Sequence, residues 1–458
     1  MRKVEGDSGA APPAKTFSTH ITRLLALGLP LIGARAAEFI IPIADSSMVG
    51  RYDTAELAAF GIGWQTWIFL YVSGLGLLVA VTILTSRAQG AGDLAGRTLV
   101  WHRGLRTAVI AGLGILLLCQ FGAPALRAIG LNETLVDRGG AVLRAYGWGA
   151  PAAMIYLATS AFMAGSGRPV PDMLIMGAAV PIKLGLNWLL VGGHGGMPAL
   201  GAVGAALATS VMIWTVAIVF ALYVLVATGA GQRGLRSDPA ERRAIDRRLL
   251  QLGVPIALSM ALETGAYLAL ALMVGYVGPE DVGAYRAAMS AAMTPFMIAT
   301  VLSGATSVLV GHAIGRGDPV NMRRAAASGF TVVAVAMALL AIPIALMSTT
   351  FAQWFTADPK LLPTIAACLQ VTSAYLLFEG LQIALKLVLR SLGDVWLPFW
   401  ISVASYWLVG VVSAAFLGVV GGLGAPGIVA GLGIAMVFSA LGNAWRYSHV
   451  VRRKITQL

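Results

Sequence analysis

The stretch "GARAAEFIIPIADSSMVG" (residues 33–50) is almost entirely small and apolar, yet it carries Arg35, Glu38 and Asp45. At about 100° per residue, Glu38 and Asp45 lie within about 20° of one direction on a helix, and Arg35 lies about 60° from Glu38. One helix face therefore carries all three charges. Because a charge at the lipid-facing centre of a helix costs about 2.5–3.5 kcal/mol, this face is predicted to line a cavity or another helix.

The composition is typical of a membrane protein. Of 458 residues, 58% are hydrophobic and 11% are charged, against roughly 25% charged in soluble domains. Apolar runs of about 20 residues, long enough to cross a bilayer core, recur along the whole chain. The sequence predicts an all-α integral membrane protein with twelve transmembrane helices, at roughly 20–49, 56–86, 96–122, 135–165, 168–191, 198–227, 247–276, 281–313, 321–348, 360–391, 394–418 and 425–451.

The positive residues predict the orientation. The net charge is +12, and 23 of the 32 Lys and Arg residues fall on the side of the termini, against 5 on the other side. This asymmetry indicates cytoplasmic termini, and it favours membrane orientation over nucleic-acid binding as the reason for the charge. The first 18 residues lack the features of a signal peptide, so the first helix is expected to remain in the mature protein. The predicted organisation is a disordered tail (1–19), an N-terminal lobe (20–227), a cytoplasmic basic linker (228–246), a C-terminal lobe (247–451) and a short tail (452–458).

The two halves of the chain are related by an internal repeat. Positions 225 apart match at Pro30 and Pro255, at Met48-Val49-Gly50 and Met273-Val274-Gly275, and at Gly92-Asp93 and Gly317-Asp318; positions 226 apart match at Gly167 and Gly393 and at Gly201 and Gly427. The repeat also pairs Glu38 with Glu263. Two six-helix halves inserted with the same orientation are typical of transporters whose substrate site lies between the halves, although a duplicated structural protein or channel is an alternative.

Further charged residues lie within predicted helices: Lys183, Glu263, Arg286, Glu379 and Lys386. Glu379, Gln382 and Lys386 share one helix face by their spacing. One interpretation of the charges within helices is purely structural ion pairing, of Arg35 with Glu38 and of Glu379 with Lys386. We favour a functional interpretation, because burying an ion pair is repaid only by excellent geometry. Removing a carboxylate from water favours its protonated form, so proton coupling is a hypothesis.

Three motifs carry a family resemblance: "ADSSMVGR" (44–51), "VGHAIGRGDP" (310–319) and "LVLRSLGD" (387–394). In their residues, order and spacing the sequence resembles the multidrug and toxic compound extrusion (MATE) family, closest to its NorM-type bacterial branch, from about Leu24 to Gly442. The resemblance implies two six-helix lobes around a central cavity. It also implies a secondary antiporter in the bacterial cytoplasmic (inner) membrane that exports organic, usually cationic, compounds in exchange for H+ or Na+.

The same resemblance implies roles for individual residues. Asp45 matches the aspartate that binds the coupling cation in the N-terminal lobe, and Asn187 matches a polar position beside it. Glu263 and Glu379 match the acidic site of the C-terminal lobe. The expected coupling ion is H+, or Na+ at Asp45 or at Glu263 and Glu379, with no other metal or cofactor. The expected partners are a small-molecule substrate and the lipid bilayer, and the protein is expected to be a monomer that binds no nucleic acid.

The sequence departs from the family pattern at two positions. Lys183 stands where Asn is common, and Tyr285-Arg286 stands where His-Gln is common. With Arg35 and Lys386, four interior bases balance four interior acids, and a neutral cavity attracts cations poorly. Export of a zwitterionic or anionic metabolite and the flipping of a lipid or polysaccharide precursor therefore remain alternatives. The cavity and substrate candidates are Arg35, Glu38, Lys183, Asn187, Tyr285, Arg286, Gln382 and Lys386.

Enzymatic and ATP-driven functions are disfavoured. No GxxxxGK[ST] motif occurs, and "GLGAPG" (422–427) lacks the preceding strand that a dinucleotide site requires. The five histidines are scattered without an HExxH motif, which argues against catalytic zinc. Cys119 and Cys368 each lie in an apolar run and are predicted to be packing residues. The protein is therefore not expected to be an enzyme.

Overall fold

The computed structural model describes residues 17–128, 132–228, 238–356 and 358–456. Within these ranges, the side chains of residues 17, 18, 34–39 and 453–456 lie outside the description. Arg35 and Glu38 are therefore placed by their backbone alone, within a long first helix. What their side chains contact lies outside the described residues.

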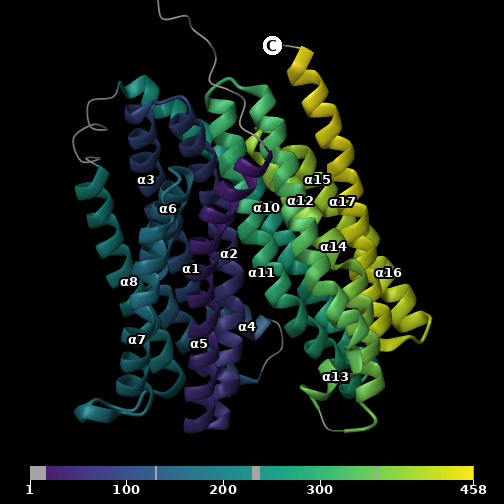
Figure 1. The fold of residues 1–458 in the computed structure, drawn as a ribbon. Helices are drawn as coiled ribbons and strands as arrows, with labels where there is room; N and C mark the ends of the chain where they lie inside the picture. The colour runs from purple at the N-terminus through teal and green to yellow at the C-terminus, as the bar shows by residue number, and fades with distance from the viewer. Residues whose placement is uncertain (1–16, 129–131, 229–237, 357, 457–458) are drawn as a thin grey trace, which may run out of the picture.

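The described chain is helical throughout and forms two lobes that stand side by side (Figure 1). The N-terminal lobe contains α1 (Phe17–Tyr52), α2 (Thr54–Gly90), α3 (Leu94–Gln120), α4 (Gly122–Ala128), α5 (Glu133–Gly147), α6 (Ala150–Gly165), α7 (Val170–Val191), η1 (His194–Gly196) and α8 (Gly201–Thr228). The C-terminal lobe contains α10 (Pro239–Val277), α11 (Pro279–Gly315), α12 (Pro319–Leu346), α13 (Ser348–Gln353), α14 (Leu362–Ser391), α15 (Trp396–Val403), η2 (Ala404–Val411), α16 (Val412–Ala414), η3 (Ala415–Val420) and α17 (Gly424–Thr456).

The hydropathy of these helices makes the chain a multi-pass membrane protein. In the described residues, 10 helices are long and apolar enough to cross a bilayer, and Thr19–Gly33 and Ala150–Gly165 are shorter apolar segments. The short segments fall in the first and fourth of the twelve predicted spans. The fourth, predicted as one helix over 135–165, is two helices, because Pro151 lacks the backbone N–H that a continuous helix would need. The helix predicted to begin at 247 starts at Pro239, where the Asp238 side chain caps it by accepting from the Ala240 amide.

The structure reproduces the sequence repeat in its turns. Gly92 and Gly317 adopt left-handed φ angles of 73° and 67°. The next residues, Asp93 and Asp318, each cap a helix by accepting a hydrogen bond from the amide three positions on. These turns lie 225 positions apart, as the sequence register predicts.

At the opposite end of the lobes, the register predicted by the sequence is shifted. Gly201 begins the last long helix of the N-terminal lobe with a left-handed φ of 52°. The residue that begins the last long helix of the C-terminal lobe in the same way is Gly424, with a φ of 60°, rather than Gly427. Beside each, a carboxylate accepts from the next amide: Glu56 from Ala202, at 2.9 Å, and Asp281 from Ala425, at 2.6 Å. Glu56 and Asp281 are themselves 225 positions apart.

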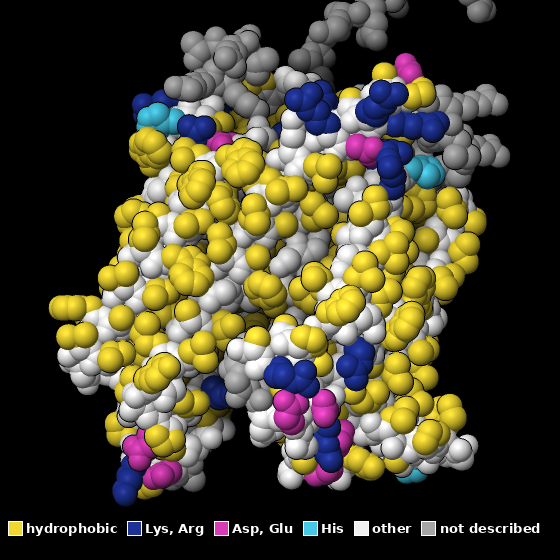
Figure 2. Space-filling view, turned by 180° about the vertical axis from the view of Figure 1, so that it is seen from behind, with side chains coloured by type: hydrophobic (Ala, Val, Ile, Leu, Met, Phe, Trp, Pro, Cys, Tyr) yellow, Lys and Arg dark blue, Asp and Glu magenta, His cyan; other side chains and the backbone are white. Residues whose placement is uncertain are grey.

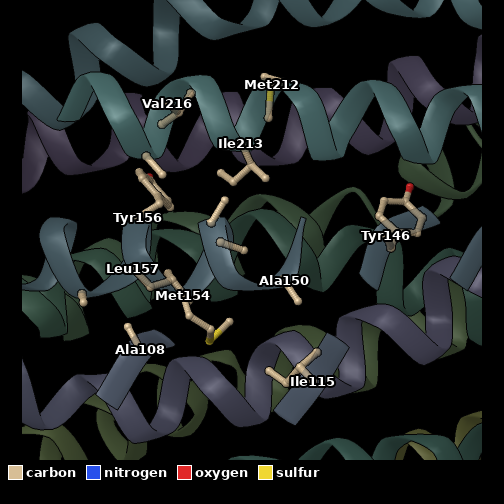
Figure 3. Packing of buried hydrophobic residues seen from close by; sticks show 14 of the residues in the cluster. Ala108, Ile115, Tyr146, Ala150, Met154, Tyr156, Leu157, Met212, Ile213 and Val216 are labelled. Carbon is tan, nitrogen blue, oxygen red and sulfur yellow. The ribbon is translucent and has the colours of Figure 1, made fainter. Parts of the chain in front are cut away.

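Each lobe has its own apolar core. In the N-terminal lobe, α6 packs between α3 and α8: Met154 points toward α3, which carries Ala108 and Ile115, and Tyr156 lies beside Val216 of α8 (Figure 3). The predicted packing role of both cysteines is confirmed, since Cys119 and Cys368 are free thiols buried in the cores of the N- and C-terminal lobes. The cores also touch across the lobes, since Ile83 of α2 packs with Ile256 of α10 and Val395, and Leu24 of α1 joins a cluster of the C-terminal lobe.

The lobes meet along α2, which packs on both α10 and α11, and along α1, which packs on α11 and α12. The crossing of α2 with α11 lies close to the turns at 91–93 and 316–318, and we call this end the closed end. A Cβ atom on Gly90 would lie 2.2 Å from the carbonyl oxygen of His312, and one on Gly315 would lie 2.0 Å from that of Arg87. Both approaches are too close for any other residue, so glycine sets the distance between the helices. Gly90 and Gly315 are related by the repeat, being 225 positions apart.

A symmetric pair of hydrogen bonds flanks this crossing. Arg87 donates from Nε and Nη2 to the carbonyl oxygen of Ser391, at 3.2 and 2.5 Å. His312 donates from Nε2 to the carbonyl oxygen of Gly165, at 2.8 Å. Arg87 and His312 are 225 positions apart, and Gly165 and Ser391 are 226 apart, so each lobe binds the other with equivalent residues. At the opposite, open end, the molecular surface is divided (Figure 2).

We predict that Gly315→Ala opens the closed end. The added methyl group meets backbone rather than a flexible side chain, and overpacking of this kind costs about 1–3 kcal/mol. Spin labels at Arg168 and Arg323, two exposed positions in different lobes, should report a longer distance in double electron–electron resonance.

Gly304→Ala in the same helix is the control, because no atom lies within 4 Å of its built Cβ. An unchanged distance distribution in Gly315→Ala would contradict the role of the glycine crossing.

Candidate functional site

The N-terminal lobe buries a charged cluster between α1 and α7. Lys183 Nζ lies 2.8 Å from Asp45 Oδ1, and Asn187 Nδ2 donates to the same oxygen at 2.5 Å. Lys183 and Asn187 are one turn apart on α7, so both side chains face Asp45. All three residues have an exposed fraction of 0%. Lys183 is therefore a built-in counter-ion of Asp45.

The hydrogen bonds in this cluster are nearly complete. Lys183 Nζ also donates to Asn187 Oδ1, at 2.6 Å, and to the carbonyl oxygen of Ala205 in α8, at 2.9 Å. Its three donors thus have three acceptors. Asp45 Oδ2 has no hydrogen-bond partner among the described residues, although it is buried. One carboxylate oxygen is left able to accept a proton or a cation.

An aromatic cluster from α2 and α5 stands within electrostatic range of Asp45. Tyr146 is 1% exposed, and its ring packs 5.5 Å from Trp67 and 5.7 Å from Trp64. Ring packing of this kind holds large side chains in place without polar contacts. The N-terminal site is therefore bounded by a rigid, mostly apolar wall.

The C-terminal lobe holds a second ion pair, between α10 and α14. Lys386 Nζ lies 3.0 Å from both Oε1 and Oε2 of Glu263, and Ser259 Oγ donates to Glu263 Oε1 at 2.9 Å. The Arg390 side chain, 5% exposed, acts electrostatically on Glu263. Glu263 is surrounded by protein, yet 19% of its side chain is exposed. Unlike Asp45, Glu263 therefore keeps partial access to solvent.

Glu379 lies close to this pair without joining it. It is 3% exposed, and its Oε2 has no hydrogen-bond partner among the described residues. The sequence allowed an ion pair between Glu379 and Lys386, but Lys386 binds Glu263 instead. The two residues share a face of α14, and Lys386 acts on Glu379 through its field alone.

Gln382 belongs to a buried hydrogen-bond network beside Glu379. Its Nε2 donates to the Tyr406 hydroxyl at 3.0 Å, and its Oε1 accepts from Ser439 at 2.9 Å. The Tyr406 ring also lies 5.7 Å from Lys386 Nζ, which adds a cation–π contact. These contacts fix the positions of Gln382 and Lys386 on α14.

The remaining sequence candidates lie outside both clusters. Tyr285 packs in the apolar core of the C-terminal lobe with an exposed fraction of 6%. Arg286 is exposed, and the ion pairs within the described ranges do not include it. Asp45 lies in a different lobe from Glu263 and Glu379, so the three acids form two sites and not one.

Sequence reasoning missed two buried features. Asp172, 2% exposed, accepts hydrogen bonds from Tyr156 at 3.1 Å and Ser160 at 2.5 Å. Its position after Gly-Arg-Pro gave no sign of burial, because acids are common in the first turn of a helix. Arg390 was counted with the loops. Its spacing from Lys386, one turn along α14, is the signal that places it near the site.

The described residues include no group of three or more His, Cys, Asp or Glu suited to a metal ion. A metal centre held by such a group is therefore absent from the described part of the chain. Two of the buried carboxylates, Asp45 and Glu263, form ion pairs with lysine.

Comparisons with known proteins place the chain in a family. The MatE family model matches residues 30–189 and 255–416. The chain is 30% identical over 416 residues to "Probable multidrug resistance protein NorM" of Caulobacter vibrioides, covering 91% of this chain and 88% of that protein. It is 31% identical over 452 residues to the protein of the same name in Rhodopseudomonas palustris, covering 97% and 95%.

The fold agrees with this match. The structure is similar to the crystal structure of the eukaryotic MATE transporter AtDTX14, with a TM-score of 0.86 and 18% identity over 95% of this chain and 98% of that one. The protein is a helical, two-lobed membrane transporter and not an enzyme. The chain belongs to the MATE family, as its motifs predict.

We predict that Lys183→Met strongly destabilises the protein. It leaves Asp45 buried and unpaired, and breaking a buried ion pair in this way costs about 3–5 kcal/mol. The apparent melting temperature in detergent, followed by tryptophan fluorescence, should fall, and Asp45→Asn in the same chain should recover most of the loss. Lys360→Met, at an exposed lysine, is the control; a melting temperature equal to that of this control would contradict the pairing.

Proposed function

We propose that the protein is a secondary antiporter that exports organic compounds in exchange for H+ or Na+. The observation that carries this proposal is a pair of buried carboxylate oxygens, Asp45 Oδ2 and Glu379 Oε2, one in each lobe, without hydrogen-bond partners in the described structure. Buried polar atoms are almost always paired, so each oxygen is a natural position for a proton or a small cation. The names of the NorM relatives support multidrug efflux as the activity.

The arrangement of the lobes supports an alternating mechanism. The lobes are joined at the closed end and divided at the open end (Figure 2). A ligand shifts such an equilibrium only if it binds the two states differently. Loading an unpaired carboxylate changes its charge and its hydrogen bonds, which provides that difference. Substrate and coupling ion would then favour opposite arrangements of the lobes.

The proposed location is the bacterial cytoplasmic membrane, with both termini in the cytoplasm. The excess of Lys and Arg at the closed end supports this orientation. In that orientation the described state faces outward. The transporter would act as a monomer with a small-molecule substrate and no cofactor beyond its coupling ion.

A second candidate substrate class is a zwitterionic or anionic metabolite. It is favoured by the two lysine pairs, because Asp45 and Glu263 are each already neutralised by a lysine. A fixed counter-ion removes the attraction that an organic cation would otherwise feel. The organic cation remains the first choice because of the relatives, and an experiment on Lys183 separates the two.

We predict that Glu379→Gln abolishes coupling while leaving the protein folded. The amide cannot exchange a proton, and Glu379 has no ion pair to lose. Substrate-induced proton release from liposomes should vanish, whereas the size-exclusion profile should match that of the wild type. Glu280→Gln, at an exposed carboxylate, is the control. Full coupling in Glu379→Gln would rule out this residue as a coupling site.

We predict that Lys183→Asn increases the preference for cationic over zwitterionic substrates about tenfold, equivalent to about 1.4 kcal/mol. Asn187 still donates a hydrogen bond to Asp45, but the fixed positive charge is gone. The measurement compares uptake of a cationic dye and of a zwitterionic analogue into everted vesicles. An unchanged ratio would show that Lys183 does not set substrate charge.

A further inference from the structure

A pocket at the closed end, between the two lobes, is unrelated to the buried carboxylates. Its volume is about 560 Å³, within the range of about 300–1,000 Å³ found for small-ligand sites. The N-terminal lobe contributes the end of α2, and the C-terminal lobe contributes α10 and the start of α15. The lining residues are Leu84, Arg87, Arg248, Gln251, Leu252, Gly393, Val395 and Trp396. We propose that this pocket binds the phosphate headgroup of an anionic phospholipid.

The charge of the pocket calls for an anion. Arg87 and Arg248 lie close enough to act electrostatically on each other, and the lining contains no acid. No ion pair within the described ranges includes either arginine. Asp394, next to Gly393 in sequence, is already bound by Arg446 Nε at 2.5 Å. Two guanidinium groups facing one space match the oxygens of a phosphate diester.

Arg87 keeps a free donor for such a ligand. Its Nε and Nη2 bind the carbonyl oxygen of Ser391, and a guanidinium group has donors on a third nitrogen as well. Arg248 is exposed, and Gln251 lies one turn further along the same helix. The pocket can therefore offer charged and neutral donors together without breaking the contact between the lobes.

The surroundings of the pocket favour a lipid over a soluble anion. Arg87 lies in the last turn of α2, and Trp396, 53% exposed, begins α15. Arginine and tryptophan at a helix end are typical of the membrane–water boundary. Val254 and Leu258, 40% and 44% exposed, continue the helix face of Gln251 along α10 toward the apolar belt. The helix α15, which packs on α10, carries the exposed Trp400. This surface can receive acyl chains while the headgroup occupies the pocket, as in other basic pockets between transmembrane helices.

A lipid in this pocket would touch both lobes beside the Arg87 hydrogen bond. It would therefore stabilise the closed end and favour the arrangement described here. This consequence rests on the alternating mechanism proposed above, whereas binding itself does not. A binding measurement thus tests the pocket even if the proposed transport function is wrong.

The test measures lipid binding to the full-length protein by native mass spectrometry in detergent. Dioleoyl phosphatidylglycerol is the probe, and dioleoyl phosphatidylcholine is the zwitterionic comparison. Arg248→Ala should weaken phosphatidylglycerol binding about fivefold, equivalent to about 1 kcal/mol, as expected for one basic residue at a membrane surface. Arg247→Ala is the matched control, because it removes the same charge from an exposed neighbour outside the lining.

Three outcomes would overturn the proposal. The first is an equal loss of binding in Arg248→Ala and Arg247→Ala, which would indicate only a diffuse charge effect. The second is phosphatidylcholine binding as tight as that of phosphatidylglycerol. The third is displacement of the lipid by inorganic phosphate at equal concentration, which would show a site for free anions. Selective loss in Arg248→Ala, with phosphate unable to compete, supports the lipid site.

Discussion

The neutralisation of buried carboxylates within each lobe is the constraint on which the rest of the structure depends. Asp45 is paired with Lys183 across α1 and α7, and Glu263 with Lys386 across α10 and α14. An unpaired charge at these depths would cost several kcal/mol, so neither pair can be separated cheaply. Because both pairs lie inside a lobe, the lobes can move relative to each other without breaking them. Each lobe therefore keeps its buried ion pairs within itself, whereas the ion pairs that cross between the lobes, from Arg103 and Arg106 of α3 to Asp246 of α10, are partly exposed and correspondingly weaker.

The seam has the opposite character. At the closed end the lobes approach through glycine, and they exchange hydrogen bonds from Arg87 and His312 to backbone carbonyl oxygens. A hydrogen bond of this kind contributes about 1 kcal/mol net to stability, whereas breaking a buried ion pair costs about 3–5 kcal/mol. The two bonds are related by the repeat, so each lobe contributes an equivalent donor and acceptor. A seam of this strength can hold one arrangement and still release it when a ligand binds.

Much of this organisation is predictable from the sequence, because hydropathy and the repeat register are local properties of the chain. The register placed Gly92 and Gly317 in equivalent turns, and the structure agrees. The partner of Lys386 was not predictable, since spacing along one helix placed Glu379 on the same face and only the tertiary fold brings Glu263 of α10 within reach of Lys386. The proximity of Arg87 to Ser391 depends on the crossing of two distant helices, which no sequence period encodes.

The two charged clusters differ in their access to water, and this difference bears on the order of events. Asp45 is fully buried, whereas 19% of the Glu263 side chain is exposed. Both unpaired oxygens are buried, but Glu379 lies beside the accessible pair, and Asp45 has no comparable neighbour in the described structure. If an ion enters in this arrangement, the C-terminal cluster is the one it reaches without rearranging helices. Loading of Asp45 then requires movement of α1 or α7, so the duplicated lobes would perform unequal steps despite their common fold.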